Sequence, residues 1–185
     1  MRTALGASSL FVWSSCNATA ISTLQRIPLD GGGETVAAEL YNSQALFANA
    51  SDEVQLDACI DCLAASNDVV ALGRNEANCT SGGSVTLWHD TGTSWAKGAT
   101  IVDAVLAASM PAGLCGFGRV LRVHDDHNGT LLFVGVPDAY NGTGAVTVHD
   151  VADWLQPVKL CEWRPSSAAT RRFGGSLALR PITGE

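Results

Sequence analysis

An internal repeat of about 60 residues is the feature that most constrains how this chain can fold. Residues 67–95 and 128–154 share one order: an apolar run ending in Gly, a polar stretch with a second Gly, an alternating segment, a His-Asp pair and a Trp. The matched positions are Gly73 with Gly135, Gly83 with Gly144, His89 with His149, and Trp95 with Trp154. Repeated units of this length favour stacked, similar substructures over one irregular core.

Each unit is predicted to be a meander of short antiparallel strands. The run LLFVGV (131–136) is apolar throughout and suits the centre of a stack, whereas AVTVHD (145–150) alternates and suits a place nearer an edge. Neither kind of sheet could bury both of its faces alone. Stacking the sheets around an axis would cover these faces and leave only short edges exposed, which is the arrangement of a β-propeller.

Phe-Gly pairs mark the places where units begin. Phe117-Gly118 opens one unit, and Phe173-Gly174 follows 56 residues later. We therefore expect an all-β chain of four-stranded antiparallel sheets, equivalent to about three blades of a partial propeller. The expected units are a partial blade with its connector, a blade, a second blade with the Phe-Gly motif and the start of another, at residues 1–55, 56–114, 115–172 and 173–185.

These residues resemble the FG-GAP repeats of integrin-alpha-like β-propellers. The family pattern runs from Phe-Gly through a small-apolar strand and an Asp-rich loop to an apolar strand ending in Gly-Ala-Pro, a Gly-containing hairpin and an alternating strand. Three stretches match it in order: Phe117-Gly118, then Gly135-Val136-Pro137 with Val in place of Ala, then Gly144 with AVTVH and Trp154. The resemblance implies a propeller of usually seven blades, of which this chain supplies a part, and a role in cell adhesion.

In that family, the loop between the first two strands of some blades binds calcium. Here the stretch HDDHNG supplies Asp125, Asp126 and Asn128 as candidate metal ligands. Calcium takes six to eight oxygen ligands, yet this loop is shorter than the family's and has Phe133 where a terminal carboxylate would stand. The alternative is a solvated β-turn with Asx-type hydrogen bonds. No cofactor is expected unless this degenerate loop still binds calcium.

Sequons and cysteines indicate the compartment. The chain has N-glycosylation sequons at Asn17, Asn49, Asn78, Asn128 and Asn141. Its six cysteines are Cys16, Cys59, Cys62, Cys79, Cys115 and Cys161. Together they predict a glycoprotein, extracellular or at the cell surface, whose cysteines form disulfides of undetermined pairing. Cys59 and Cys62 could instead form half of a zinc site, but no second pair of ligands follows at a suitable spacing.

Charge and hydropathy exclude several partners. The net charge of −7 comes without a Lys/Arg cluster, so nucleic acid is a poor partner. No apolar run approaches the roughly 20 residues of a membrane helix, so direct membrane insertion is not expected. The first 20 residues leave two interpretations open, a cleavable signal peptide or a strand around Ser8–Trp13 that matches Gly83–Trp88 in pattern.

Function is predicted from these features together. Nucleophile motifs such as G-x-S-x-G are absent from the sequence, so we expect no enzyme activity in this segment. The leading hypothesis is a glycosylated propeller segment that binds an extracellular protein or glycan in cell adhesion and contacts further blades of a parent chain. The alternative hypothesis is the propeller part of a secreted hydrolase, with catalytic residues outside this segment.

Overall fold

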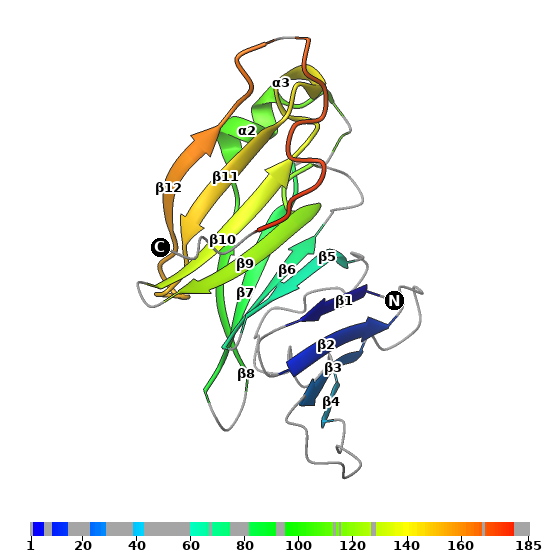
Figure 1. The fold of residues 1–185 in the computed structure, drawn as a ribbon, viewed down its shortest axis with the longest axis vertical. Coiled ribbons are helices and arrows are strands. Elements are labelled where there is room, and N and C mark those ends of the chain that lie inside the picture. Colours follow the sequence, from blue (N-terminus) through cyan, green and yellow to red (C-terminus); the bar gives the residue numbers. More distant parts are fainter. Residues whose placement is uncertain are drawn as a thin grey trace, which may run out of the picture.

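The computed structural model is mostly β, with four-stranded antiparallel sheets and few short helices (Figure 1). It describes the backbone of four strands within residues 1–42, followed by residues 60–66, 68–74, 82–91, 95–112, 114, 116–126, 129–167 and 169–179. Side chains are described in these later ranges except at positions 60, 61, 74, 95 and 126. Among these residues, no helix has the length and apolar character needed to cross a bilayer.

Each sheet is a meander in which strands pair in sequence order. The first contains β1 (Arg2–Leu5), β2 (Ser9–Ser14), β3 (Thr23–Pro28) and β4 (Glu39–Asn42). The second contains β5 (Ile60–Ala65), β6 (Val69–Arg74), β7 (Ser84–Asp90) and β8 (Trp95–Ile101). The third contains β9 (Val120–Asp126), β10 (Gly129–Val136), β11 (Ala145–Asp150) and β12 (Val158–Trp163). The four-stranded antiparallel sheets expected from the repeat are therefore present.

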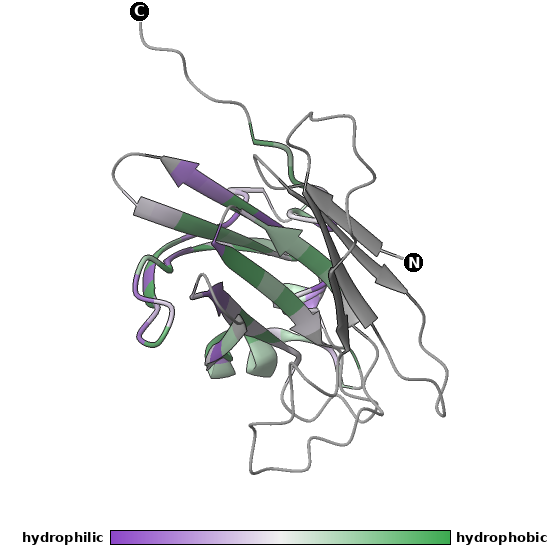
Figure 2. Cartoon of the chain, turned by 90° about the horizontal axis from the view of Figure 1, so that it is seen from below, coloured by the Kyte–Doolittle hydropathy of each residue, from purple (hydrophilic) through white to green (hydrophobic). Residues whose placement is uncertain are grey.

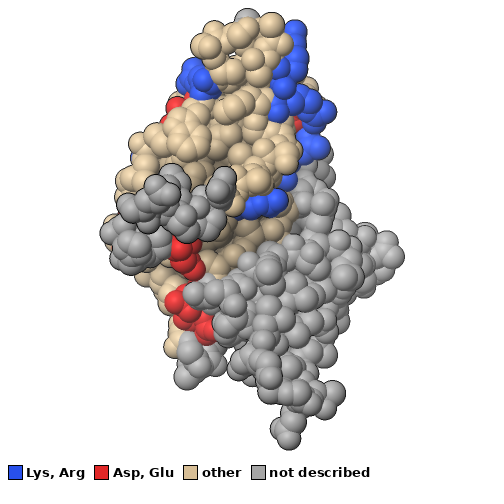
Figure 3. Space-filling model, in the orientation of Figure 1, with Lys and Arg blue, Asp and Glu red and all other residues tan. Residues whose placement is uncertain are grey.

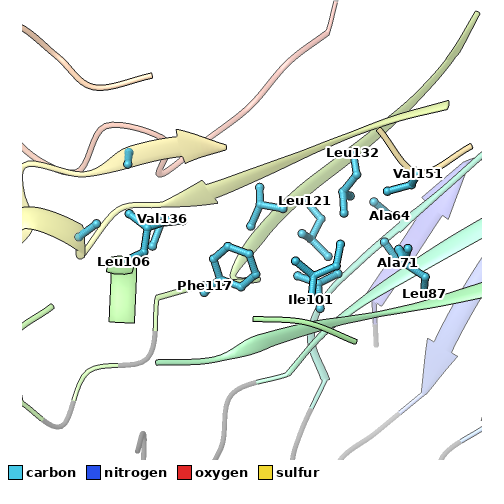
Figure 4. Packing of buried hydrophobic residues seen from close by; sticks show 14 of the residues in the cluster. Ala64, Ala71, Leu87, Ile101, Leu106, Phe117, Leu121, Leu132, Val136 and Val151 are labelled. Carbon is cyan, nitrogen blue, oxygen red and sulfur yellow. The ribbon is translucent and has the colours of Figure 1, made fainter. Parts of the chain in front are cut away.

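The hydrophobic core lies between the second and third sheets. Ala71, Leu87 and Ile101 of the second sheet belong to one buried cluster with Leu121 and Leu132 of the third (Figure 4). Hydrophobic colour follows these strands, whereas hydrophilic residues lie mainly at strand ends and in loops (Figure 2). The near-continuous apolar sequence of β6 and β10 is thus explained by their central position in the sheets.

Helix α2 (Ala104–Ser109) connects the second sheet to the third. Asp103 caps it, since its Oδ1 accepts hydrogen bonds from the backbone N–H groups of Val105 and Leu106 at 3.1 and 3.0 Å. Leu106 is fully buried and joins the core cluster. The other described helix, α3 (Ala139–Gly142), is a single turn in the connection between β10 and β11.

A glycine-lined contact, which we call the Phe-Gly seat, joins each Phe-Gly pair to the unit before it. At the first seat, a Cβ added at Gly73 would lie 1.9 Å from the carbonyl oxygen of Gly118, and one at Gly83 would lie 2.3 Å from that of Phe117. The Phe117 N–H donates to the carbonyl of Gly82 at 3.0 Å. Only glycine permits this approach of two backbones.

The second seat repeats the first. A Cβ at Gly135 would lie 2.1 Å from the carbonyl oxygen of Gly174, and one at Gly144 would lie 2.2 Å from that of Phe173. The Phe173 N–H donates to the carbonyl of Thr143 at 2.9 Å. The predicted equivalence of Gly73 with Gly135 and of Gly83 with Gly144 is therefore confirmed.

The end of β7 fixes the register of the repeat. The Asp90 N–H donates to the Asp68 carbonyl at 2.9 Å, and the Val151 N–H donates to the Thr130 carbonyl at the same distance. Asp90 therefore corresponds to Val151, one position later than the His-Asp match of the sequence would require.

The predicted match of His89 with His149 is wrong by that one residue. His89 corresponds to Asp150, and His149 corresponds to Trp88. A shift of one residue moves a strand side chain to the opposite face of its sheet. His89 stacks on Trp154 of the next unit, with ring centroids 5.2 Å apart, whereas His149 is only 3% exposed. The two histidines are thus not a repeated structural pair.

The predicted match of Trp95 with Trp154 is also wrong. Trp95 begins β8, opposite Asp90, whereas Trp154 lies in the turn between β11 and β12. There the Trp154 carbonyl accepts a hydrogen bond from the Ala99 N–H at 3.0 Å. A Cβ added at Gly98 would lie 2.5 Å from the same oxygen. Trp154 is therefore a contact between the sheets rather than a repeat of Trp95.

Candidate ligand-binding end

Most described charged side chains lie near one or the other end of the paired sheets, whereas Arg122 and Lys97 lie within strands. At the end with α2 and α3, which we call the basic end, lie Arg119, Arg164, Arg171 and Arg172, and Lys159 reaches this end with its Nζ, which contacts Asp103. At the opposite end lie Asp68, Asp90, Asp125, Asp150 and Asp153. Lys and Arg atoms accordingly gather in the upper part of the molecule and several acidic atoms lie in the lower part (Figure 3). The chain is acidic as a whole but locally basic at one end.

The α3 turn at the basic end has a strained backbone. Tyr140 and Asn141 have φ values of 52° and 55°, in the left-handed region, which costs about 1–2 kcal/mol for each residue other than glycine. Two hydrogen bonds hold the first of them: its N–H donates to Ser109 Oγ at 3.2 Å, and its hydroxyl donates to Glu162 Oε1 at 2.7 Å. Such strain marks a turn whose surroundings determine its conformation.

Glu162 is the centre of a charged network. Besides the hydrogen bond from the Tyr140 hydroxyl, its carboxylate accepts hydrogen bonds from Lys159 Nζ at 2.8 Å and from Arg164 Nε at 2.5 Å. Burial acts to raise the pKa of Glu162, but these three hydrogen bonds outweigh it and lower the pKa to about 2. Glu162 is therefore ionised at any physiological pH.

Lys159 extends this network to α2. Its Nζ also contacts Asp103 Oδ2 at 2.6 Å. Burial acts to lower the pKa of Lys159, but its hydrogen bonds to Asp103 and Glu162 raise it above the usual value. Burial acts to raise the pKa of Asp103, but the hydrogen bonds from Lys159 and from the Leu106 N–H lower it below the usual value. One lysine thus ties the capping residue of α2 to strand β12.

Tyr140 stays protonated in this setting. Burial raises its pKa, and the hydrogen bond to the Glu162 carboxylate raises it further, to about 12. The guanidinium of Arg164 lies over its ring, 3.8 Å from the centroid. The phenol therefore acts as a fixed donor and as a platform for a cation.

Asp138 is held between two arginines on the other side of α3. Its Oδ2 lies 2.9 Å from Arg119 Nη1, and its Oδ1 lies 3.8 Å from Arg172 Nη2. Arg171 Nη1 donates to the backbone carbonyl of Asn141 at 3.3 Å. The described part of the basic end therefore carries five cations against three carboxylates, and most of its arginines contact the turn from 138 to 141.

His149 is a buried residue of β11. Its Nε2 is 3.0 Å from Thr147 Oγ1, and its ring meets that of Phe117 edge to face, with centroids 6.3 Å apart. Burial lowers the pKa of His149 to about 4, assisted by the positive charge of Lys159. The imidazole is therefore neutral at physiological pH and serves packing.

The candidate calcium loop lies where β9 and β10 pair as neighbouring antiparallel strands. Asp126 pairs with Gly129, so only positions 127 and 128 connect β9 to β10. Asp125 lies in β9 opposite Thr130 and is exposed, while the side chains of Asp126 and Asn128 lie outside the described residues. Within the described ranges, no three His, Cys, Asp or Glu side chains form a group that could hold a metal ion. Calcium binding here stays a prediction from the sequence.

Most modification sites fall outside the described residues, namely Asn17, Asn49, Asn78 and Asn128 together with Cys16, Cys59, Cys79 and Cys115. Asn141 is described and is exposed on α3, beside Arg171. Cys161 is exposed on β12 with a free thiol, and Cys62 is half-buried on β5. Glycosylation and disulfide pairing stay predictions.

The structure identifies residues that the sequence did not single out. Tyr140, Lys159 and Glu162 are separated by up to 22 residues, and they meet only because the β10–β11 connection reaches the end of β12. The available signal was the Asn-Gly pair after Tyr140, which favours left-handed turn conformations. Nothing in the spacing indicated the ionic partners.

Comparisons with known proteins give no further identity. No protein-family model matches this chain, and neither curated proteins nor solved structures show a match to it. The resemblance to FG-GAP repeats therefore remains a prediction, and function has to be inferred from the geometry itself.

Proposed function

We propose that this chain is an extracellular, N-glycosylated β-propeller segment that acts as a protein- or glycan-binding module in cell adhesion. The observation that carries this proposal is the repeated Phe-Gly seat. At the first seat, Phe117-Gly118 leads directly into β9 of the next sheet. Phe173-Gly174 occupies the same position on the following unit, which supports a further sheet stacked in the same way.

The face of the third sheet that points away from the second sheet fits such a stack. Phe133 of β10 contacts Trp163 of β12 on this face, with centroids 6.2 Å apart, and Trp163 is 50% exposed. The equivalent of Phe133 in the second sheet is Ala71, which is fully buried against the third sheet. Two partly exposed aromatic rings on one face of a sheet suit contact with another blade of a parent chain rather than with water.

Binding is favoured over acid–base catalysis at the basic end. A general acid or base works best with a pKa near the working pH. Here the pKa of Glu162 is lowered to about 2 and that of Tyr140 is raised to about 12, so neither group exchanges protons near neutrality. Both are suited instead to holding a surface in a fixed shape.

The proposal can be tested with the chain secreted from eukaryotic cells. We expect a mass decrease on enzymatic removal of N-glycans, and we expect cells to be retained on a surface coated with the folded chain. The same chain, reduced and heat-unfolded before coating, is the control and should retain few cells. A secreted chain without glycans, or equal retention by both coats, would contradict the proposal.

A further inference from the structure

We propose that the basic end binds a linear acidic glycan through its sulfate or carboxylate groups, an inference that rests on the proposed binding function. The first argument is the exposure of the charges. The cationic side chains of Arg119, Arg164 and Arg172 are 40%, 53% and 64% exposed. Their partners Asp138 and Glu162 are 13% and 14% exposed, and Asp103, the partner of Lys159, is 9% exposed. A ligand that approaches this end therefore meets guanidinium groups before carboxylates.

The type of cation is the second argument. Four of the five cations are arginines, and the single lysine, Lys159, is already held between Asp103 and Glu162. A guanidinium presents a planar set of donors that matches two oxygens of a sulfate or carboxylate at once. Arg171 and Arg172 are adjacent and both exposed, so they can engage neighbouring groups of one chain.

The third argument is the distribution of these arginines around α3. Arg164 lies over the Tyr140 ring, Arg171 bonds to the Asn141 carbonyl, and Arg119 lies on Asp138. The charges therefore surround a turn instead of converging on one point. A polymer with repeated negative groups can contact several of them together, whereas a single small anion could contact only one or two.

A glycan is favoured over a folded protein partner by the chemistry of this turn. Protein interfaces draw most of their affinity from aromatic and arginine side chains that are fully desolvated near the centre of the contact. Here Arg119, Arg164 and Arg172 are 40–64% exposed around a turn, and the ring of Tyr140 is covered by Arg164. Affinity based on charge alone suits a regularly charged polysaccharide and weakens with salt.

The sequon at Asn141 dictates the form of the protein used in the test. A glycan on Asn141 would lie beside Arg171 and cover this surface. Thr143→Ala removes the sequon, keeps Asn141 in its left-handed conformation and leaves the backbone carbonyl that accepts from Phe173. This variant of the full chain, secreted from eukaryotic cells, is the background for all measurements.

The probe is a sulfated heparin octasaccharide, with its desulfated counterpart and an acidic peptide of equal charge as comparisons. Titration calorimetry should show binding of the sulfated probe only, with affinity decreasing as salt increases. The double substitution Arg171→Gln with Arg172→Gln should weaken binding at least about tenfold, which corresponds to about 1.4 kcal/mol. Lys97→Gln, which removes an exposed cation on β8, should change affinity less than twofold.

Absence of octasaccharide binding, equal losses in the double variant and in Lys97→Gln, or tighter binding of the peptide would each overturn the inference. These outcomes differ from a failure of the proposed function. Cells retained on the folded chain without octasaccharide binding would leave the adhesion proposal standing and reject only the acidic glycan. Octasaccharide binding without cell retention would reject adhesion and keep the ligand class.

Discussion

At the first Phe-Gly seat, Phe117 is 1% exposed between two sheets, whereas at the second seat Phe173 is only partly buried. The backbones of the two seats are nearly identical, since the two close approaches to glycine differ by no more than a few tenths of an ångström. The glycines therefore determine where the chain crosses to the next unit. Burial of the aromatic ring depends on the sheet that follows, which at the first seat supplies His149 as a partner.

This comparison separates two contributions to stability. The backbone contact is local and is formed by one unit with the start of the next. The side-chain contribution is cooperative, because it requires a complete neighbouring sheet, as in other repeat proteins whose stability arises from interfaces between units. Substitutions at corresponding positions should therefore have unequal effects.

The largest expected effect is the loss of the Phe117 ring. Phe117→Ala would leave a cavity between the sheets and destabilise the chain by about 3–5 kcal/mol. Phe173→Ala should cost about 1 kcal/mol, because much less apolar area is removed from a buried setting. Denaturant unfolding followed by tryptophan fluorescence measures both. Equal losses would show that the two rings are buried alike and that the comparison between the seats is wrong.

His149, whose ring packs against Phe117, predicts a pH dependence of the stability. The pKa of His149 is about 4 in the folded chain and 6.5 without burial, so the unfolded chain binds this proton more readily. Stability is fully present above pH 6.5 and decreases as the pH falls toward 4, by about 3 kcal/mol in total. His149→Gln should flatten the profile in this window, measured by denaturant unfolding at several pH values. An unchanged slope would exclude His149 as its source.

The sequence predicted the parts of the fold that depend on local pattern. Apolar runs, alternation and glycine spacing gave the four-stranded sheets and both seats, because Gly73 and Gly135 are required by direct backbone contact. The histidine match failed because the repeat units differ by one residue in register, and sequence letters alone cannot show on which face of a sheet a side chain lies.

The basic end was not predictable in the same way. Its ionic contacts join Asp103 to Lys159 across 56 positions of the sequence, and no periodic pattern relates them. The net charge of −7 concealed a local excess of arginine, because Asp68, Asp90, Asp125, Asp150 and Asp153 lie at the opposite end of the strands. Only the fold brings these charges to separate ends.

A smaller effect should distinguish steric contact from backbone strain in the second seat. Gly135→Ala would place a Cβ 2.1 Å from a backbone oxygen and should destabilise the chain by about 2 kcal/mol. Gly142→Ala is the matched control, since its Cβ would meet nothing within 4 Å and its φ of +81° is the only obstacle. It should cost about 1 kcal/mol. Thermal unfolding of both variants checks this order, and the reverse order would contradict a seat formed by close backbone approach.

The smallest effect concerns the network beside the second seat. Tyr140→Phe keeps the ring beneath Arg164 but removes the hydroxyl that donates to Glu162, which should cost about 1 kcal/mol. The pKa of Glu162 should then rise from about 2 toward its ordinary 4.5. Because a lowered carboxyl pKa gives stability that is present above pH 4.5 and lost as the pH falls toward 2, this acid-dependent loss should be smaller in the variant. Unfolding measured between pH 5 and 2 tests this expectation, and an identical loss in both proteins would mean that Lys159 and Arg164 alone set the ionisation of Glu162.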